Sequence, residues 1–433
     1  MHSIYRISTL CFLLSLCAVA PSSAQNDSTE APKGSRLTVG GYGEAVFSRH
    51  FYSDNVFRYS KADKYKDAPG YNRVDLPHAV VMLGYDFGHG WTVGMEIEFE
   101  HGGVEAAVEK ETEETGEFEQ ELERGGEVAL EQFWVQKSFN KYMNVRAGHI
   151  VVPVGMTNNS HMPNQFFGVY RPEGENTIMP CTWHETGLAV WGRAGHWRYE
   201  AQLLPGLNSN LFNDAGWIHN GSASPYEFRP ANQPACAARV DWTGLPGLRL
   251  SLSGYLGNSN NNDIVTDPNG KYYKYNATVA IGSFDFAYKG RSFVVRGNVD
   301  YGHLSDAAAI SARNKNQTTM TGNPYPHTFV GEAAWDAGIE AGVDLLSLIN
   351  QKSKIKNQKI YLFARYDQYD SYVPAEGLAD IGWCARKVVS GGVNWYPLPQ
   401  IAVKAEGGVR LLDSQYNNEP FVALGVTWCG FFK

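Results

Sequence analysis

The chain contains no apolar run long enough to cross a bilayer as a helix. Its longest apolar run, residues 7–20, is shorter than the roughly 20 residues that a transmembrane helix needs. Arg6 lies just before this run and a small-residue cleavage pattern ending at Ala24 follows it, as is typical of a secretory signal peptide. We therefore predict a signal peptide over 1–24 and an exported chain with no helical anchor.

Cysteine is scarce, and no catalytic signature is present. Two of the six cysteines fall in the predicted signal peptide, and the spacing of the other four matches no disulfide framework. The sequence leaves open whether Cys181, Cys236 and Cys384 form a disulfide or remain thiols. No nucleophile motif accompanies the histidines and aspartates. We predict no enzymatic activity, no catalytic residue, no cofactor, no bound metal and no nucleic-acid partner.

No linker-like segment divides the rest of the chain, and no plug-sized segment precedes residue 36. A soluble chain of this size usually splits into two or more domains. We instead predict a short periplasmic segment over 25–35 and a single domain over 36–433. The shortness of the first segment disfavours an energy-coupled transporter, because it is too small to plug a barrel.

Apolar and polar residues alternate through most of the chain. Residues 403–411 show this clearly, with Val403 and Ala405 on one face and Lys404 and Glu406 on the other. Successive side chains of a strand point to opposite faces, so this period predicts strands with one apolar and one polar face. Sixteen strands are predicted, over 36–47, 78–87, 91–101, 128–139, 143–150, 185–193, 197–204, 236–242, 248–256, 276–288, 292–301, 334–345, 359–369, 387–396, 401–411 and 421–431.

The connections between these strands alternate between short and long, which is typical of outer-membrane barrels. Glycine (45 residues) and aromatic residues (13%) are abundant, as expected for kinked strands and aromatic girdles. Every backbone group must be bonded internally in hydrocarbon, so such a sheet has to close. The predicted fold class is all-β: a transmembrane antiparallel β-barrel of about 16 strands, with short periplasmic turns and long external loops.

The polar faces of the predicted strands carry charges of both signs, with more acidic than basic groups. A soluble sandwich cannot bury such a set, whereas a barrel of this strand number encloses an aqueous lumen. The residues predicted to line the lumen are Glu96, Glu98, Glu100, Arg146, Arg198, Arg239, Arg296, Asp336, Glu340, Asp344, Arg365, Lys404, Glu406 and Arg410.

The third long connection, residues 151–185, mixes apolar residues with histidine, arginine and glutamate. This composition predicts a loop that folds into the lumen and narrows it. The candidate constriction residues are His161, Arg171, Glu173, Glu175, His184 and Glu185. Two other interpretations stay open. The same residues, with His149, are usual metal ligands, although their spacing matches no known site, and Arg–Glu and His–backbone contacts could simply fix the loop.

This region resembles the third-loop region of porins grouped with the phosphate-selective porin O and P family, in a Bacteroidetes-type branch. The matching residues are Arg146-Ala147-Gly148-His149, Pro153-Val154-Gly155, Arg171-Pro172-Glu173 and Pro180-Cys181-Thr182-Trp183-His184-Glu185-Thr186-Gly187. The resemblance implies a sixteen-stranded diffusion channel, a homotrimer, with an inward third loop. Phosphate-selective members carry an arginine ladder and a lysine cluster, whereas the polar faces here are mixed and acid-rich.

The second long connection, residues 104–127, is strongly acidic. It holds ten glutamates against Lys110 and Arg124, so it carries almost all of the net negative charge of the chain. Such a run is typical of a solvated loop. Binding of divalent cations, or attraction of cations to the channel mouth, is the alternative.

Together these patterns predict a multi-pass protein of the bacterial outer membrane, in contact with its lipid. The predicted function is passive diffusion of small hydrophilic solutes or ions through a lumen narrowed by the third loop. A selective anion or phosphate channel is one alternative. A surface receptor or adhesin, or a hydrolase embedded in the barrel, is an alternative of another class.

Overall fold

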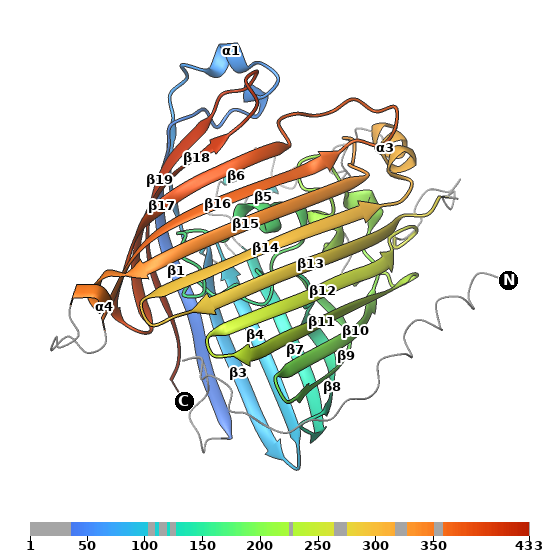
Figure 1. Cartoon of the computed structure of the whole chain (residues 1–433). Helices are drawn as coiled ribbons and strands as arrows, with labels where there is room; N and C mark the ends of the chain where they lie inside the picture. The colour runs from blue at the N-terminus through green and yellow to red at the C-terminus, as the bar shows by residue number, and fades with distance from the viewer. Residues whose placement is uncertain are drawn as a thin grey trace.

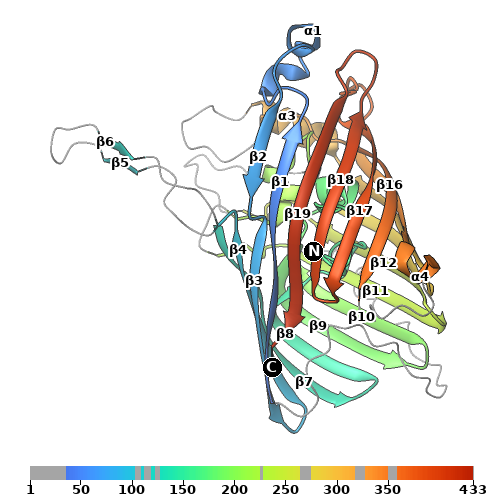
Figure 2. The ribbon, with the colours of Figure 1, turned by 90° about the vertical axis from the view of Figure 1, so that its left-hand side faces the viewer.

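Sixteen antiparallel strands form a closed barrel (Figures 1 and 2). Each strand pairs with its neighbours in chain order, and β1 (Leu37–His50) closes the ring against β19 (Glu419–Phe431). The computed structural model describes residues 36–102, 109–111, 119–121, 127–224, 228–263, 275–316, 327–349 and 358–432. The predicted signal peptide, 1–24, and the predicted segment 25–35 lie outside these residues.

All sixteen predicted strands are present, most of them a few residues longer than expected. Between β1 and β19 they are β3 (His78–Gly88), β4 (Trp91–Glu100), β7 (Glu127–Asn140), β8 (Met143–Val151), β9 (His184–Ala194), β10 (Trp197–Pro205), β11 (Pro234–Leu245), β12 (Leu248–Asn258), β13 (Thr278–Lys289), β14 (Phe293–Leu304), β15 (Ala333–Asp344), β16 (Lys359–Val373), β17 (Ala385–Leu398) and β18 (Ile401–Leu411). The fold class predicted from the sequence is therefore confirmed.

One wall of the barrel is extended by a short strand that the sequence pattern missed. β2 (Tyr71–Asp75) pairs with the end of β1, and β3 pairs with its beginning. Pro77 lies between β2 and β3 and has no N–H to donate to the ladder, so the strand breaks there. Figure 2 shows β2 continuing the line of β3 beside β1.

The long connections carry the helices. These are α1 (Ala62–Tyr65), α2 (Glu173–Ile178), α3 (Ala307–Lys315) and α4 (Leu345–Ile349), with 3-10 turns at Val56–Arg58, Ser209–Leu211 and His219–Ser222. No helix in the described ranges is long and apolar enough to cross a membrane. Most of the acidic connection 104–127 lies outside the described residues, but β5 (Glu109–Glu111) and β6 (Glu119–Glu121) within it pair antiparallel.

The outer face of the barrel is apolar. On β19, Val422, Leu424, Val426 and Trp428 are exposed, while the residues between them point inward and are buried. The same alternation leaves an outer surface of valine, leucine, isoleucine and aromatic side chains on most of the other strands. A closed sheet with this exterior satisfies its backbone internally and suits hydrocarbon. The protein is therefore a multi-pass outer-membrane protein.

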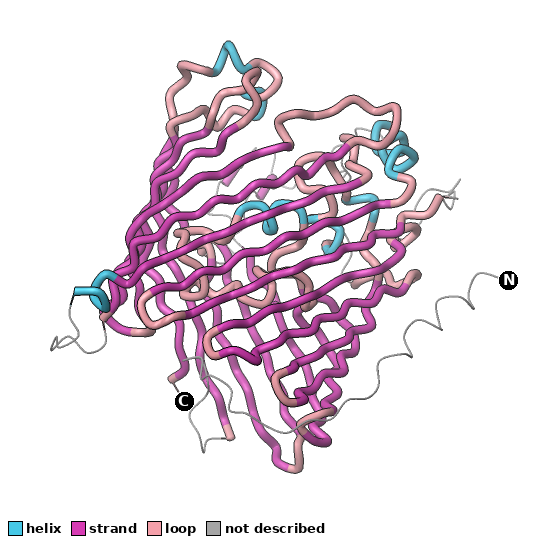
Figure 3. The backbone as a smooth tube through the Cα atoms, viewed as in Figure 1, coloured by secondary structure: helices cyan, strands magenta, loops and turns pink. Residues whose placement is uncertain are grey.

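A hydrophobic core lies inside one side of the barrel. It joins Ile178 and Trp183 of the third long connection to Phe212 and Trp217 of the next one, and to Ile310 of α3. Figure 3 shows loops and short helices behind the front strands, and Figure 1 places α3 at the rim of the barrel. The third long connection and the one after it therefore pack against each other and against α3.

Candidate channel constriction

Residues 152–183, called the inward loop below, connect β8 to β9 and bind the opposite wall of the barrel. Three backbone N–H groups of the loop donate to carboxylates on that wall. Gly174 donates to Asp367 Oδ2 (2.9 Å), Val169 to Glu406 Oε2 (2.7 Å) and Phe167 to Glu340 Oε2 (3.3 Å). Because β15, β16 and β18 lie about half-way around the ring from β8, the loop reaches across the lumen.

Lys404 is the most completely enclosed anchor of the inward loop. Its side chain is fully buried, and Nζ donates to the carbonyl oxygens of Pro163 (2.5 Å), Phe166 (2.9 Å) and Gly168 (2.8 Å). An ammonium group has three donors, so all of them are used. The sequence predicted Lys404 as a lumen-lining residue, and the structure places it on the inner face under the loop.

An aromatic contact supports the same stretch of the loop. The ring of Phe167 stacks on Phe363 with 5.5 Å between centroids and lies 5.2 Å from the ring of Tyr361. The guanidinium carbon of Arg296 lies 5.1 Å from the centroid of the Phe167 ring, and Arg296 is also paired with Glu340. This contact combines apolar burial with a cation–π interaction.

Glu175, on α2, holds the loop's own backbone. It is buried, and its carboxylate accepts hydrogen bonds from the N–H groups of Met156 and Thr157 and from the Thr157 hydroxyl. Gly155 packs directly against this carboxylate, with a φ of +83° and no room for a Cβ. Burial and the nearby Asp300 carboxylate raise the pKa of Glu175, against the opposing effect of the Thr157 hydrogen bonds.

Glu173, two residues earlier, faces the opposite wall. Arg410 Nε lies 2.6 Å from its Oε2, and the Tyr369 hydroxyl donates to its Oε1 at 2.6 Å. Burial alone would raise the pKa of Glu173, but the guanidinium groups of Arg410 and Arg386 outweigh burial and hold the pKa below its ordinary value. Glu173 is therefore an ionised anchor of the loop.

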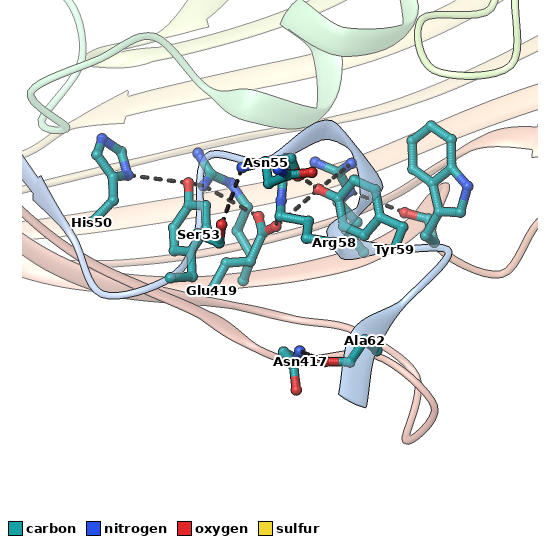
Figure 4. A network of polar contacts seen from close by, with 12 residues as sticks. His50, Ser53, Asn55, Arg58, Tyr59, Ala62, Asn417 and Glu419 are labelled. Carbon is teal, nitrogen blue, oxygen red and sulfur yellow. Dashed lines mark hydrogen bonds and ion pairs between the residues drawn. The ribbon is translucent and has the colours of Figure 1, made fainter. Parts of the chain in front are cut away.

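A polar network continues from Arg410 to the connection between β1 and β2. Figure 4 shows Arg58 and Tyr59 converging on Glu419, with Arg58 Nε at 2.8 Å and the Tyr59 hydroxyl at 2.9 Å from Oε1. Tyr59 also stacks on Trp383 with 4.8 Å between centroids, and burial raises the pKa of Tyr59 to about 12. This network joins the connection between β1 and β2 to the first residue of β19 and to Arg410, the partner of Glu173.

The wall beside the beginning of the inward loop carries a row of ion pairs. Arg239 is buried and lies 2.7 Å from Asp241 and 2.8 Å from Asp285, while its Nη1 donates to Gly155 O at 3.0 Å. Arg198 is 3.3 Å from Asp241 and is also paired with Glu200. Arg146 donates to Gln136 at 3.0 Å and lies over the Trp134 ring.

The other predicted lumen residues also lie on the inner face. Arg365 is buried among Glu340, Asp367 and Glu406, and Asp336 accepts from Asn298. Asp344 lies at a strand end, where its carboxylate accepts from Leu346 and Ile360. Glu96 and Glu98 are buried on β4, and Glu100 lies near its end. Many of these charges thus bind a loop or each other.

The six predicted constriction residues do not converge on one point. Glu173 binds Arg410 on the barrel wall, whereas Glu175 binds the loop backbone at Thr157. Glu185 pairs with Arg229 at 3.2 Å. His184 contacts His149, with 2.5 Å between Nδ1 and Nε2, while Arg171 donates to the His161 carbonyl at 3.3 Å. No disulfide joins the cysteines in the part of the chain that the structure describes.

Several residues were missed by the sequence reasoning, namely Glu131, Asp285, Asn394 and Glu419 on the strands and Arg58 in a loop. Asp285 follows the same period-two pattern as the residues that were chosen, so that pattern could have identified it. Asn394 is uncharged, and its amide donates to Phe167 O at 2.9 Å. Arg58 lies in a loop, where no periodicity indicates which way a side chain points.

Comparisons with known proteins agree with the fold. No family model matches the chain. An uncharacterized protein of Aquifex aeolicus (strain VF5) is 24% identical over 396 residues, which cover 90% of this chain and 79% of that protein. Salmonella typhi OmpF in its complex with daunomycin has a TM-score of 0.50 at 11% identity, over 91% of this chain and 97% of that chain.

The outer membrane channel DcaP of Acinetobacter baumannii has a TM-score of 0.48 at 12% identity, over 93% of this chain and 99% of that chain. At these identities the likeness to OmpF concerns the fold alone. The closed ring of sixteen strands and the apolar exterior agree with that likeness. The chain therefore has a porin-like outer-membrane barrel fold.

Proposed function

We propose that this protein is a passive diffusion channel for small hydrophilic solutes or ions, narrowed by the inward loop. The observation that carries the proposal is the set of bonds between the loop backbone and the inner wall. Lys404, Glu406 and Asp367 hold residues 163–174 across a closed barrel whose exterior is apolar. A loop that is fixed in this way narrows the lumen, and it does not swing across the path of the solute and close it.

The charge pattern favours a channel without strong selectivity for one sign of ion. The inner wall pairs its arginines with carboxylates, as in the Arg239–Asp285 and Arg296–Glu340 pairs. Paired charges leave little net potential along the path, but they create local fields across it that orient polar solutes. We propose that six residues shape the part of the solute path that the inward loop narrows: His161, Arg171, Glu173, Glu175, His184 and Glu185.

The test is the conductance of purified protein in a planar bilayer, with the reversal potential measured under a KCl gradient. We expect discrete single-channel steps and a weak ion preference. A strong anion preference would support the selective anion or phosphate alternative instead. Protein that is folded by circular dichroism and inserts without any conductance would contradict the channel proposal.

We further propose that three copies assemble, as the resemblance of residues 146–187 to the phosphate-selective porin family implies. Chemical crosslinking of the folded protein in detergent, followed by analytical ultracentrifugation, tests this. We expect a species of three times the mass of one chain. Crosslinking that yields single chains alone would contradict the assembly and leave the conductance test unaffected.

A further inference from the structure

A compact cluster of potential metal ligands lies where the inward loop meets β4 and β7. Glu96 of β4, Glu131 of β7 and His161 of the loop each offer one ligand atom, and these atoms all lie within 4.8 Å of one another. The three residues are almost completely buried, with exposed fractions of 3%, 0% and 8%. Buried carboxylates are costly unless they are paired or bind a cation.

A β-bulge directs Glu131 into this cluster. Glu96 pairs with Gln132, and the next residue of β4, Ile97, pairs with Leu130, so Glu131 is an extra residue in β7. Leu130 and Phe133 are exposed on the outer face, and Glu131 between them is buried. Bulges reorient single side chains and are frequent beside functional sites. Regular alternation could not place Leu130 and Phe133 on one face of the strand.

Each of the three residues has one buried polar atom without a hydrogen-bond partner. These atoms are Glu96 Oε1, Glu131 Oε1 and His161 Nε2. Leaving such groups unpaired costs about 1–3 kcal/mol each, and more for charged groups. Three unpaired atoms on side chains that meet in one buried cluster therefore indicate a ligand with which all three side chains can bond.

The other polar atoms of these side chains are already held. Gln132 donates to Glu96 Oε2, and the Tyr42 hydroxyl lies 3.4 Å from Glu131 Oε2. His161 Nδ1 lies 3.0 Å from the carbonyl oxygen of Asn158, which can only accept, so Nδ1 carries the proton. Nε2 then presents a lone pair to the cluster, which is the form of histidine that binds metals, with its orientation fixed from behind.

The surroundings of the cluster are acidic. Glu96, Glu98 and Glu131 interact with one another and with the guanidinium group of Arg171. Glu98 Oε1 is also without a hydrogen-bond partner. When these three carboxyl groups ionise, a divalent cation would balance the charge that the Arg171 guanidinium leaves uncompensated.

We propose that Glu96, Glu131 and His161 bind a divalent transition-metal ion of the Zn²⁺ type, which fastens the inward loop to the barrel wall. One imidazole and two carboxylates are a ligand set that suits Zn²⁺. Ca²⁺ and Mg²⁺ favour oxygen ligands alone. Glu98 or a water molecule completes the coordination. Glu96 and Gln132 also line a cavity of about 340 Å³.

A second group of ligand types, His78, Glu98 and Glu100, does not carry the same argument. His78 Nδ1 already lies 2.6 Å from Glu44 Oε1, and two of the three residues are partly exposed. The proposal therefore rests on the cluster that contains His161. It holds whether or not the barrel conducts, since metal binding is measured on its own.

The experiment measures Zn²⁺ binding to the folded full chain in detergent, by isothermal titration calorimetry and by metal content after dialysis. We expect one tightly bound Zn²⁺ per chain that Ca²⁺ and Mg²⁺ do not displace. Glu131→Gln and His161→Gln should each weaken binding by ~100-fold or more, since loss of outer-shell partners alone costs 10- to 100-fold. X-ray absorption should show one imidazole and otherwise oxygen ligands.

Glu332→Gln is the matched control. Glu332 Oε1 lies 3.9 Å from His303 Nε2, so this pair offers the same two types of ligand as the cluster. Both side chains are nearly half exposed. This variant should bind Zn²⁺ as the unaltered chain does. Folded chain that binds no Zn²⁺, or binding that survives both Glu131→Gln and His161→Gln, would overturn the proposal. If Glu131→Gln does not fold, His161→Gln, which alters a loop residue, decides the question.

Discussion

Replacement of Lys404 by methionine tests how the inward loop is held. Methionine keeps most of the side-chain volume and removes three hydrogen bonds to the carbonyls of Pro163, Phe166 and Gly168. A hydrogen bond to a charged group contributes about 1.5–3 kcal/mol, and removal of one partner of a buried charged network costs about 3–5 kcal/mol. These contributions are not additive, so we take the lower end of the second range. We expect the free energy that holds the loop closed to fall by about 3 kcal/mol.

Such a loss should raise the open population of the inward loop on the order of 100-fold, since each 1.4 kcal/mol is a factor of ten. Hydrogen exchange measured by mass spectrometry over residues 163–174 detects this change directly. Single-channel recordings should show noisier currents. Lys359→Met is the control, because Lys359 is exposed and its Nζ donates to the Tyr361 hydroxyl at 3.4 Å, not to the inward loop. Equal exchange in the two variants would refute the anchoring role of Lys404.

Three further predictions concern the same loop. Gly155→Ala should destabilise it by about 1–3 kcal/mol, measured by faster exchange of its amides, because the new Cβ would lie 2.1 Å from Glu175 Oε1 at a positive φ. Phe167→Ala should lower the free energy of unfolding, measured by denaturant titration, by about 3–5 kcal/mol, because it removes a buried ring that stacks on Phe363. An unchanged denaturant midpoint would exclude that packing role. The raised pKa of Glu175 means that the folded chain keeps a proton which the unfolded chain releases above about pH 4.3. The stability from this proton is fully present below that pH and is lost as pH rises through the folded pKa, so Glu175→Gln should flatten the dependence of loop exchange on pH above about 4.3.

Strand positions could be predicted because they depend on a local pattern. Alternation along 421–431 identifies both the strand and its outer face, since each residue lies either against lipid or against the interior. The same reasoning failed where the period shifts. Leu130 and Phe133 both face outward, and this spacing of three was a visible signal of the bulge at Glu131 that the assumption of regular alternation concealed.

The candidate site was predictable in outline only. The composition of residues 151–185 indicated a loop that packs inside the barrel. It could not indicate that Lys404 would lie under residues 163–168, because nothing local links segments that are more than 230 residues apart. The polar faces were predicted as lumen surface, yet many of their side chains bind loop backbone. A charge that lines water and a charge that holds a carbonyl look identical in the sequence.

The sequence by itself determined the number of strands, their order, their outer and inner faces and the composition of the third connection. Each of these follows from the environment on the two sides of a single strand, which the period of two records residue by residue. Only the tertiary structure decided how the lumen is filled, which carboxylates are paired and that Glu96, Glu131 and His161 meet. Those contacts join distant segments, and they depend on closure of the barrel and on the path of one loop across it.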